Sequence, residues 1–285
     1  QQLDRAVGAV LASAAGDALG SQYEFGPSLD DSVTPHFGRG CFGHAVGEWT
    51  DDTSMAMPLL QALARGDSLD DAAVLARVVG EWREWSKTAL DVGTQTRSVL
   101  SQLRDPITEQ ATVEVSRMVH DRMGRSGGNG SLMRTGPLAL GYLDRSPADL
   151  AVAAARVARL THWEDDNADA SALWCLAIRH AVLTGDLDAR SGVASLPEDR
   201  RERWMVLIDE ALAPGAHPRD FASGNGWVVR AFQGALAAVA GATSLVDAIE
   251  RAVRGGHDAD TVAAIAGALA GSLSGGTGVP LAWKR

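Results

Sequence analysis

The sequence has little cysteine, no long apolar run and no cluster of basic residues. Its two cysteines, Cys41 and Cys175, are too few for a disulfide framework and lack the C-x-x-C spacing of zinc or redox sites, which fits a reducing compartment. The apolar stretches fall short of the roughly 18 residues that a membrane span needs. Residues 1–20 carry neither the basic segment nor the cleavage pattern of an export signal. We therefore expect a soluble, cytoplasmic protein.

The charge balance is acidic, with a formal net charge of −10. The 26 lysines and arginines form no run, whereas a surface that binds nucleic acid needs clustered basic residues to neutralise phosphates. A nucleic-acid partner is therefore not expected, except as a modified end that serves as substrate. Acidic clusters favour cations instead.

The chain also lacks the period-two alternation of strands, while helical patterns recur along it, so we predict a mostly α-helical fold. Ser146, Pro147 and Asp149 mark a helix start by capping, by fixed backbone geometry and by charge, with the helix running to about Leu160. Ser68 with Asp71 opens another helix that presents a broad apolar face from Val74 to Trp85. There is no linker, no low-complexity tract and no repeat, which predicts one domain over residues 1–285.

Four further helices are predicted at 7–19, 167–184, 244–254 and 262–273. The first and last consist largely of alanine and glycine, so their backbones can approach neighbours closely, and we expect both at the centre. Three segments resist this pattern. Residues 22–48 form a long loop with two prolines, a candidate substrate wall; residues 123–130 form a glycine-rich turn; and residues 185–202 are predicted to be a polar, exposed excursion.

Two helix starts carry more acidic side chains than a helix cap uses. "WTDDT" supplies Thr50, Asp51 and Asp52, and "GGHDADT" supplies Asp258, Asp260 and Thr261. Either cluster alone is explained as a cap, but capping needs a single side-chain acceptor, and surplus carboxylates repel one another unless a cation lies among them.

Oxygen ligands without cysteine suit Mg²⁺, Mn²⁺ or Ca²⁺. Adjacent side chains diverge by about 100° around a helix, so Asp51 and Asp52 would serve two ions. Two such ions can polarise a water, which predicts a hydrolytic site. Glu24, in the loop after the first helix, is a further carboxylate within reach of it, or else a solvated loop residue.

Other patterns are weaker. The G-x-S-x-G match at 124–128 lacks the preceding strand of a nucleophile elbow, which excludes a serine hydrolase of that kind. "GGNGS" at 127–131 lacks the lysine of a P-loop, although its backbone amides could hold phosphate. His162 and Trp227 are each open to two interpretations, a ligand contact or an ordinary structural residue.

Six segments together resemble the ADP-ribosylglycohydrolases: "GAVLASAAGDALGSQYEF", "WTDDTSMAM", "DVGTQTR", "GGNGSLMRTGPLAL", "LTHWEDDNADAS" and "GGHDADTVAAIAGALAG". They occur in the family's order and span Gly8 to Gly271. The resemblance implies a single-domain orthogonal bundle of α-helices with two Mg²⁺ or Mn²⁺ ions in a cleft, which hydrolyses the bond between ADP-ribose and a modified side chain. One departure is His257 ahead of Asp258, where the family often has glycine or a polar residue; we expect His257 to face outward.

The resemblance also implies roles for individual residues. The implied metal ligands are Thr50, Asp51, Asp52, Asp258, Asp260 and Thr261. The implied ligand-binding residues are Gly127, Gly128, Asn129, Gly130, Ser131 and Met133 around the distal ribose and phosphates, His162 at a phosphate and Trp227 beside adenine. Asp91 resembles a mobile acid near the scissile bond, and Asp52, Glu24 and Asp91 are the candidates for proton transfer.

The expected substrate is an ADP-ribosylated protein or a small ADP-ribose conjugate, and we expect a monomer. "GDALGSQYEF" and the last segment look closer to the bacterial dinitrogenase-reductase-type members, which indicates arginine-linked ADP-ribose. The acidic residues Glu24, Asp30, Asp31 and Glu48 near the predicted entrance would favour a cationic leaving group. Alternatives are a serine-linked, nucleic-acid-linked or small-molecule acceptor, an ADP-ribose-binding module without turnover, and a purely structural relative.

Overall fold

The computed structural model describes residues 1–284 of the chain, and that range contains twelve α-helices. No strand occurs within it: extended segments form only two isolated bridges, Gly26 with His257 and Gly128 with Trp227. The predicted all-α fold is confirmed. Within residues 1–284, no helix combines the length and the apolar character needed to cross a bilayer.

The helices in chain order are α1 (Gln2–Gly20), α2 (Asp51–Ala64), α3 (Ala72–Ser86), α4 (Thr94–Leu100), α5 (Glu109–Met123), α6 (Gly136–Leu140), α7 (Pro147–Arg159), α8 (Asp165–Thr184), α9 (Glu198–Ala211), α10 (Val228–Ala240), α11 (Leu245–Arg254) and α12 (Ala259–Ser274). Short 3-10 turns lie between them, including η1 (Ser21–Tyr23) and η2 (Asn129–Ser131).

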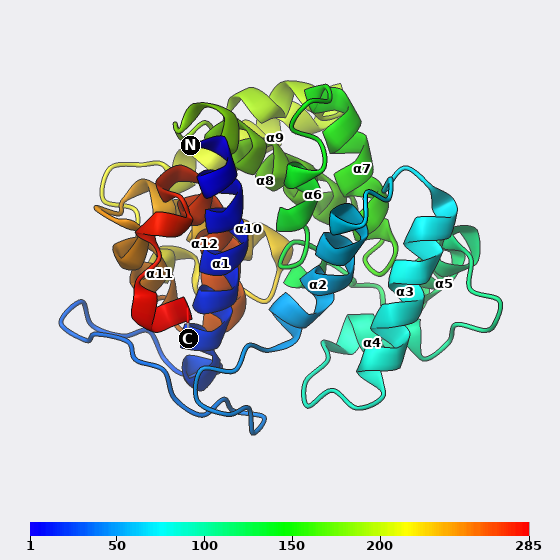
Figure 1. The fold of residues 1–285 in the computed structure, drawn as a ribbon, viewed down its shortest axis with the longest axis horizontal. Helices are drawn as coiled ribbons and strands as arrows, with labels where there is room; N and C mark the ends of the chain where they lie inside the picture. Colours follow the sequence, from blue (N-terminus) through cyan, green and yellow to red (C-terminus); the bar gives the residue numbers. More distant parts are fainter. Residues whose placement is uncertain (285) are drawn as a thin grey trace.

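Helices α1 and α12 form an antiparallel pair at the centre, as predicted for these two alanine- and glycine-rich segments (Figure 1). Their backbones touch because glycines face each other. A Cβ placed on Gly8 would lie 2.2 Å from the carbonyl oxygen of Gly271, and one on Gly20 would lie 2.4 Å from Cα of Asp260. No side chain fits between the helices at either point. The carboxyl end of α1 is thereby fixed against the beginning of α12.

The remaining helices surround this pair. Helices α10 and α11 pack on α12, α6 to α9 lie at one end, and α3 to α5 form a flank beside α2 (Figure 1). The flank is tied in by buried Trp82 of α3, which donates its indole N–H to the carbonyl oxygen of Met55 in α2 at 2.8 Å.

Local capping signals placed the starts of α3, α7 and α11. The predicted start at Ser146 has a complete capping box, in which Ser146 Oγ accepts from the backbone N–H of Asp149 and the Asp149 carboxylate accepts from that of Ser146. At α3, however, the cap is Asp71 itself, which accepts from the N–H of Ala73 at 2.8 Å, while Ser68 stays outside the helix.

Four segment predictions need correction. Helices α1, α8 and α12 begin at Gln2, Asp165 and Ala259, each earlier than the predicted residues 7, 167 and 262. Residues 185–202 are not simply an exposed excursion, because a 3-10 turn at Ser191–Ser195 and the start of α9 lie there, and Val193 and Leu196 are buried. Apolar side chains at irregular spacing escaped the periodicity analysis.

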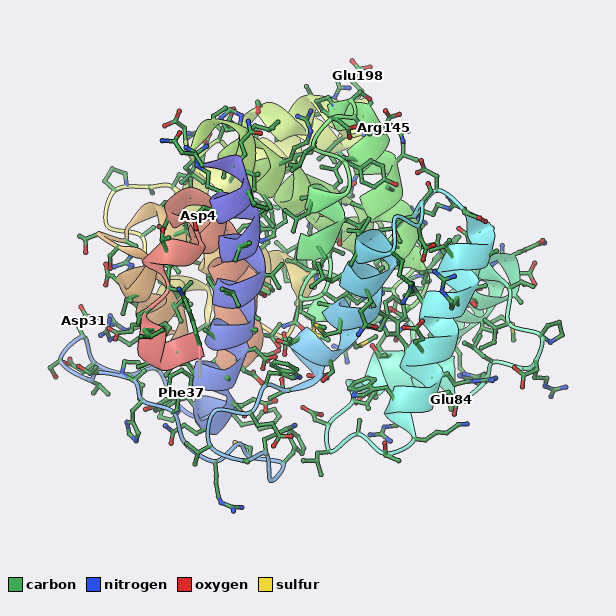
Figure 2. All side chains as sticks on the ribbon, viewed as in Figure 1. Asp4, Asp31, Phe37, Glu84, Arg145 and Glu198 are labelled. Carbon is green, nitrogen blue, oxygen red and sulfur yellow. The ribbon has the colours of Figure 1, made fainter. Side chains whose placement is uncertain are left out.

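The long loop between α1 and α2 contains no α-helix, as predicted. It runs past α11 and the start of α12, with Asp31 on its outer reach (Figure 2). Backbone bonds fasten it there: the N–H of Phe25 donates to the carbonyl of His257 at 2.6 Å, and that of Leu29 to the carbonyl of Arg254 at 2.9 Å. The loop therefore forms one wall beside the α12 start.

Candidate functional site

A cleft of about 940 Å³ opens where α1 ends and where α2 and α12 begin. Residues that are far apart in the sequence meet there because the central helix pair is antiparallel. Thirteen of the predicted site residues line the cleft: Glu24, Asp51, Asp91, Gly127, Gly128, Asn129, Gly130, Met133, His162, Trp227, Asp258, Asp260 and Thr261. The other three, Thr50, Asp52 and Ser131, are buried behind its wall.

The acidic side chains at the two helix starts do not act as caps. Neither Thr50 at the start of α2 nor Asp258 at the start of α12 caps its own helix with its side chain. Asp17, in the last turn of α1, takes over that task at α2. One of its carboxylate oxygens accepts from the N–H and hydroxyl of Thr50 at 2.9 and 2.8 Å. The other accepts from the N–H and hydroxyl of Thr53 at 3.0 and 2.6 Å. Asp51 and Asp52 are thereby left for another function.

Asp17 is a site residue that the sequence analysis missed. It is completely buried. The available signal was a single carboxylate inside the apolar segment "ASAAGDALG", because an ionised group at such a position must be matched by several donors or by a cation.

Asp258, at the start of α12, is oriented by two asparagines. Asn129 donates its side-chain N–H to Asp258 Oδ2 at 2.7 Å, and the backbone N–H of Asp258 donates to Asn225 Oδ1 at 3.0 Å. Asn225 was also missed, since a lone asparagine in a turn carries no distinguishing pattern. His257 is exposed and has a left-handed backbone with φ of 58°, so its predicted outward orientation is confirmed.

The carboxylates gather into two overlapping groups. One oxygen each from Asp17, Asp52 and Asp260 lie within 4.8 Å of one another, and so do oxygens of Glu24, Asp258 and Asp260. Asp260 is shared. The hydroxyl of Thr50 lies 2.8 Å from Asp17, 3.1 Å from Asp52 and 3.5 Å from Asp260, yet it has only one hydrogen to donate. That one hydrogen cannot serve all three carboxylates at once.

Burial and mutual repulsion shift the acidities of this group strongly. Burial, then the charges of Asp91 and Asp17, raises the pKa of Asp51 to about 7. Burial, then the charge of Asp258, raises the pKa of Glu24 to about 8. The pKa values of Asp52 and Asp260 lie well above the ordinary range, with burial the leading cause. No lysine or arginine of residues 1–284 forms an ion pair with these carboxylates, so no protein cation offsets them.

This arrangement fits a divalent cation. Buried carboxylates need a paired charge, and Asp52 Oδ1 is a buried oxygen with no hydrogen-bond partner. The donor atoms are carboxylate and hydroxyl oxygens only, which are the ligands of Mg²⁺, Mn²⁺ or Ca²⁺. The two overlapping groups of carboxylates described above can therefore hold metal.

The glycine-rich loop forms another wall of the cleft. A Cβ on Gly127 would lie 2.5 Å from the Glu164 carboxylate, and one on Gly130 would lie 3.0 Å from the ring of His162, so neither position has room for a side chain. The backbone N–H of Asn129 donates to the carbonyl of Gly226 at 2.9 Å and is not free for a phosphate. Ser131 is buried and bonded to Asn167 at 2.7 Å. Fewer groups of the loop are therefore available to a ligand in the cleft than the GGNGS motif contains.

The structure also shows the surroundings of Trp227 and of the serine in the G-x-S-x-G match. Trp227 has 41% of its surface exposed and lines the cleft, unlike the buried core tryptophans such as Trp82. Ser126, the serine of the G-x-S-x-G match, follows helix α5 instead of a strand, which agrees with the exclusion of a nucleophile elbow.

Of the four acidic residues predicted near the entrance, only Glu24 lines the cleft. Asp31 forms an ion pair with Arg219, and Asp30 accepts from the N–H and hydroxyl of Ser32. Asp31 is thus paired with a cation from outside the loop, and Asp30 is hydrogen-bonded within it.

Comparisons of sequence and of structure lead to the same group of proteins. The ADP-ribosylglycohydrolase family model matches residues 1–285. The chain is 33% identical over 288 residues to the ADP-ribosylarginine hydrolase Tri1 of Pseudomonas putida (strain GB-1), which covers 99% of this chain and 74% of that protein. It is 28% identical over 288 residues to the ADP-ribosyl-(dinitrogen reductase) glycohydrolase of Rhodospirillum rubrum, covering 98% and 89%.

The human relative is more distant, and one solved structure extends the likeness to the fold. The chain is 27% identical over 332 residues to the ADP-ribosylhydrolase ARH3 of Homo sapiens, covering 100% of this chain and 89% of that protein. A solved chain described as an ADP-ribosylglycohydrolase-related protein complex matches with a TM-score of 0.74 and 29% identity, over 99% of this chain and 92% of that one.

Proposed function

This chain belongs to the ADP-ribosylglycohydrolase family, and we propose that it is a metal-dependent hydrolase that removes ADP-ribose from arginine side chains of proteins. Its relatives are named ADP-ribosylarginine hydrolase, ADP-ribosyl-(dinitrogen reductase) glycohydrolase and ADP-ribosylhydrolase. The observation that carries the proposal is the group of carboxylates from α1, α2, α12 and the long loop, which share a cleft without a protein cation. A domain that only bound ADP-ribose would gain nothing from such repulsion.

Two Mg²⁺ or Mn²⁺ ions would be held by Thr50, Asp51, Asp52, Asp258, Asp260 and Thr261, with Asp17 behind them. When bound, such ions supply positive charge that binds vicinal ribose hydroxyls and lowers their pKa. The protein's own part is to fix the ligands: Asp17 holds the start of α2 through its bonds to Thr50 and Thr53, and Asn129 and Asn225 hold Asp258.

Hydrolysis joins a water oxygen to the anomeric carbon of the ribose and breaks the bond from that carbon to the guanidine nitrogen. The water loses a proton, and the leaving nitrogen gains one. Glu24 and Asp91 are our candidates for these transfers because both line the cleft and are only half-buried, within reach of a substrate. Asp52, ranked first from the sequence, is buried behind the wall, so we place it among the metal ligands.

The entrance to the cleft supports an arginine acceptor. Phe25 and Phe42 line it with 70% and 42% of their surfaces exposed, and their rings meet edge to face at 5.8 Å. Phe25 has a left-handed backbone with φ of 62°, which costs a bulky residue about 1–3 kcal/mol. Aromatic rings that line the same cleft as the Glu24 and Asp91 carboxylates suit a planar guanidinium, which stacks on rings and pairs with carboxylates.

The acceptor is tested by measuring ADP-ribose release from one protein with arginine-linked and another with serine-linked ADP-ribose, at equal Mg²⁺ concentration. We expect release from arginine to be faster and to stop with a chelator. Faster release from serine would overturn the acceptor, and binding of ADP-ribose without release from either protein would overturn the enzyme.

The aromatic entrance gives a second measurement. Phe42→Ala should raise KM for the arginine-linked protein by about five- to tenfold, the equivalent of one stacking contact of ~1 kcal/mol, while leaving the affinity for free ADP-ribose unchanged. Phe42→Tyr, which keeps the ring, is the matched control. An equal loss for free ADP-ribose would show that Phe42 contacts the ADP-ribose and not the acceptor.

A further inference from the structure

A buried arginine next to the cleft has no carboxylate partner. Arg134 is completely buried, and its guanidinium lies 4.3 Å from the ring centre of Trp82. Its Nη2 donates to Thr161 Oγ1 at 2.7 Å and to the carbonyl of Val157 at 3.3 Å, whereas Nε and Nη1 have no partner. Burying a guanidinium without a carboxylate partner is costly. The shortest hydrogen bond that Arg134 makes, to Thr161, therefore needs an explanation.

The hydroxyl of Thr161 joins Arg134 to His162. Thr161 Oγ1 lies 2.7 Å from Nδ1 of His162 and, like Arg134, is completely buried. Arginine can only donate, so Thr161 Oγ1 accepts from it. The threonine's single hydrogen then has one acceptor among residues 1–284, Nδ1 of His162. The reverse arrangement, with the proton on Nδ1, would leave a buried hydroxyl hydrogen without a partner.

Arg134 also prevents the usual alternative for such a hydroxyl. Ser54, Thr112 and Thr184 each donate to the carbonyl oxygen four residues earlier. Thr161, two residues beyond α7, stands in the same relation to Val157, but that carbonyl already accepts from the backbone N–H of Leu160 and from Arg134, both at 3.3 Å, which uses both of its lone pairs. The threonine hydroxyl is therefore turned from the helix towards the histidine.

We propose that Arg134, acting through Thr161, fixes His162 as the neutral tautomer with its proton on Nε2, so that His162 donates a hydrogen bond to a phosphate oxygen of the ligand. Nε2 lies on the cleft side of the ring, where Cβ atoms on Gly128 and Gly130 would approach it to 3.6 and 3.2 Å. No group of residues 1–284 accepts a hydrogen bond from it. Burial, followed by the charge of Arg134, also lowers the pKa of His162, which keeps the ring neutral.

The ligand chemistry, a diphosphate, rests on the proposed function, whereas the tautomer rests only on contacts within the protein. Arg134 and Thr161 are positioning residues here, because neither lines the cleft. Their substitution should affect the phosphate part of a ligand and leave contacts to its base unchanged.

The test combines Thr161→Val with two controls. Thr161→Ser keeps the hydroxyl, and Thr135→Val removes another buried threonine hydroxyl, one that donates to the carbonyl of Leu132 and does not touch His162. In the wild type, ¹⁵N NMR of the His162 ring should show the proton on Nε2. In Thr161→Val the tautomers should mix, and the Kd for ADP-ribose should rise about tenfold, the loss expected for one hydrogen bond to a charged group. The Kd for adenosine, which lacks phosphate, should not change.

Thr161→Ser and Thr135→Val should both retain wild-type affinity and the Nε2 proton. A proton on Nδ1 in the wild type, an unchanged Kd in Thr161→Val, or an equal loss for adenosine would each overturn the proposal. A wild type that binds no ADP-ribose at millimolar concentration would overturn the proposed function and the phosphate contact together, while the NMR result would still decide the tautomer.

Discussion

Replacing Gly20 by alanine tests how the central helix pair builds the site. An alanine Cβ there would lie 2.4 Å from Cα and 2.6 Å from the backbone nitrogen of Asp260. Carbon atoms pack at roughly 3.5 Å, and a close-packed interior leaves no space to absorb the difference. Helix α1 and the start of α12 must therefore separate by about 1 Å at this point, and Asp260 moves with its backbone.

Two opposing effects set the change in stability. Overpacking costs about 1–3 kcal/mol, and alanine in place of a helical glycine returns about 0.5–1 kcal/mol. The free energy of unfolding should therefore fall by roughly 1–2 kcal/mol. The effect on activity should be larger, because a ~1 Å displacement of a catalytic group costs about 100-fold in rate. We expect about 100-fold slower ADP-ribose release and weaker Mn²⁺ binding.

Gly8→Ala is the matched control. It makes the same change in the same helix pair, with its Cβ 2.2 Å from the carbonyl oxygen of Gly271, but at the end away from Asp260. Urea unfolding, calorimetric Mn²⁺ titration and ADP-ribose release should show similar stability losses in both variants and a loss of activity only in Gly20→Ala. If Gly20→Ala kept wild-type Mn²⁺ affinity and release, or if Gly8→Ala lost as much activity, the explanation would be refuted.

Three further outcomes are expected. Asp258→Ala or Asp260→Ala should lower ADP-ribose release by orders of magnitude without destabilising the metal-free protein, since one repelling charge is gone; full activity with unchanged metal content would contradict their assignment as ligands. The free energy of unfolding of the metal-free protein should fall as pH rises, because the pKa of Asp51 is raised from 3.8 to about 7, so the folded protein holds a proton that the unfolded chain has released. Urea unfolding at about pH 5 and about pH 8 should show this difference, and saturating Mn²⁺ should abolish it. ADP-ribose with Mn²⁺ should raise the free energy of unfolding by about 2.7 kcal/mol at a hundred times Kd, and the thermal midpoint with it, so no shift of the midpoint at millimolar concentration would exclude this ligand class.

The features predicted correctly from the sequence depend on neighbours within one or two helical turns. The capping box at Ser146, the glycine-rich helices that form the central pair, and the two acidic helix starts are all local patterns. The resemblance added their order along the chain and thereby the family. Residue type and spacing also restricted the metal to one that prefers oxygen ligands.

Only the tertiary structure decided which acidic side chains line the cleft and which lie behind them. Asp17 caps a helix that begins 34 positions further along the chain, and Asp31 is neutralised by Arg219, almost two hundred positions away. Asp52 and Glu24 are both carboxylates in the sequence, yet one is buried behind the wall and the other lines the cleft. Local sequence fixes the type of a side chain and its helical phase. The charge that it meets depends on how closely α1 and α12 approach, and that distance is set by glycines more than two hundred residues apart.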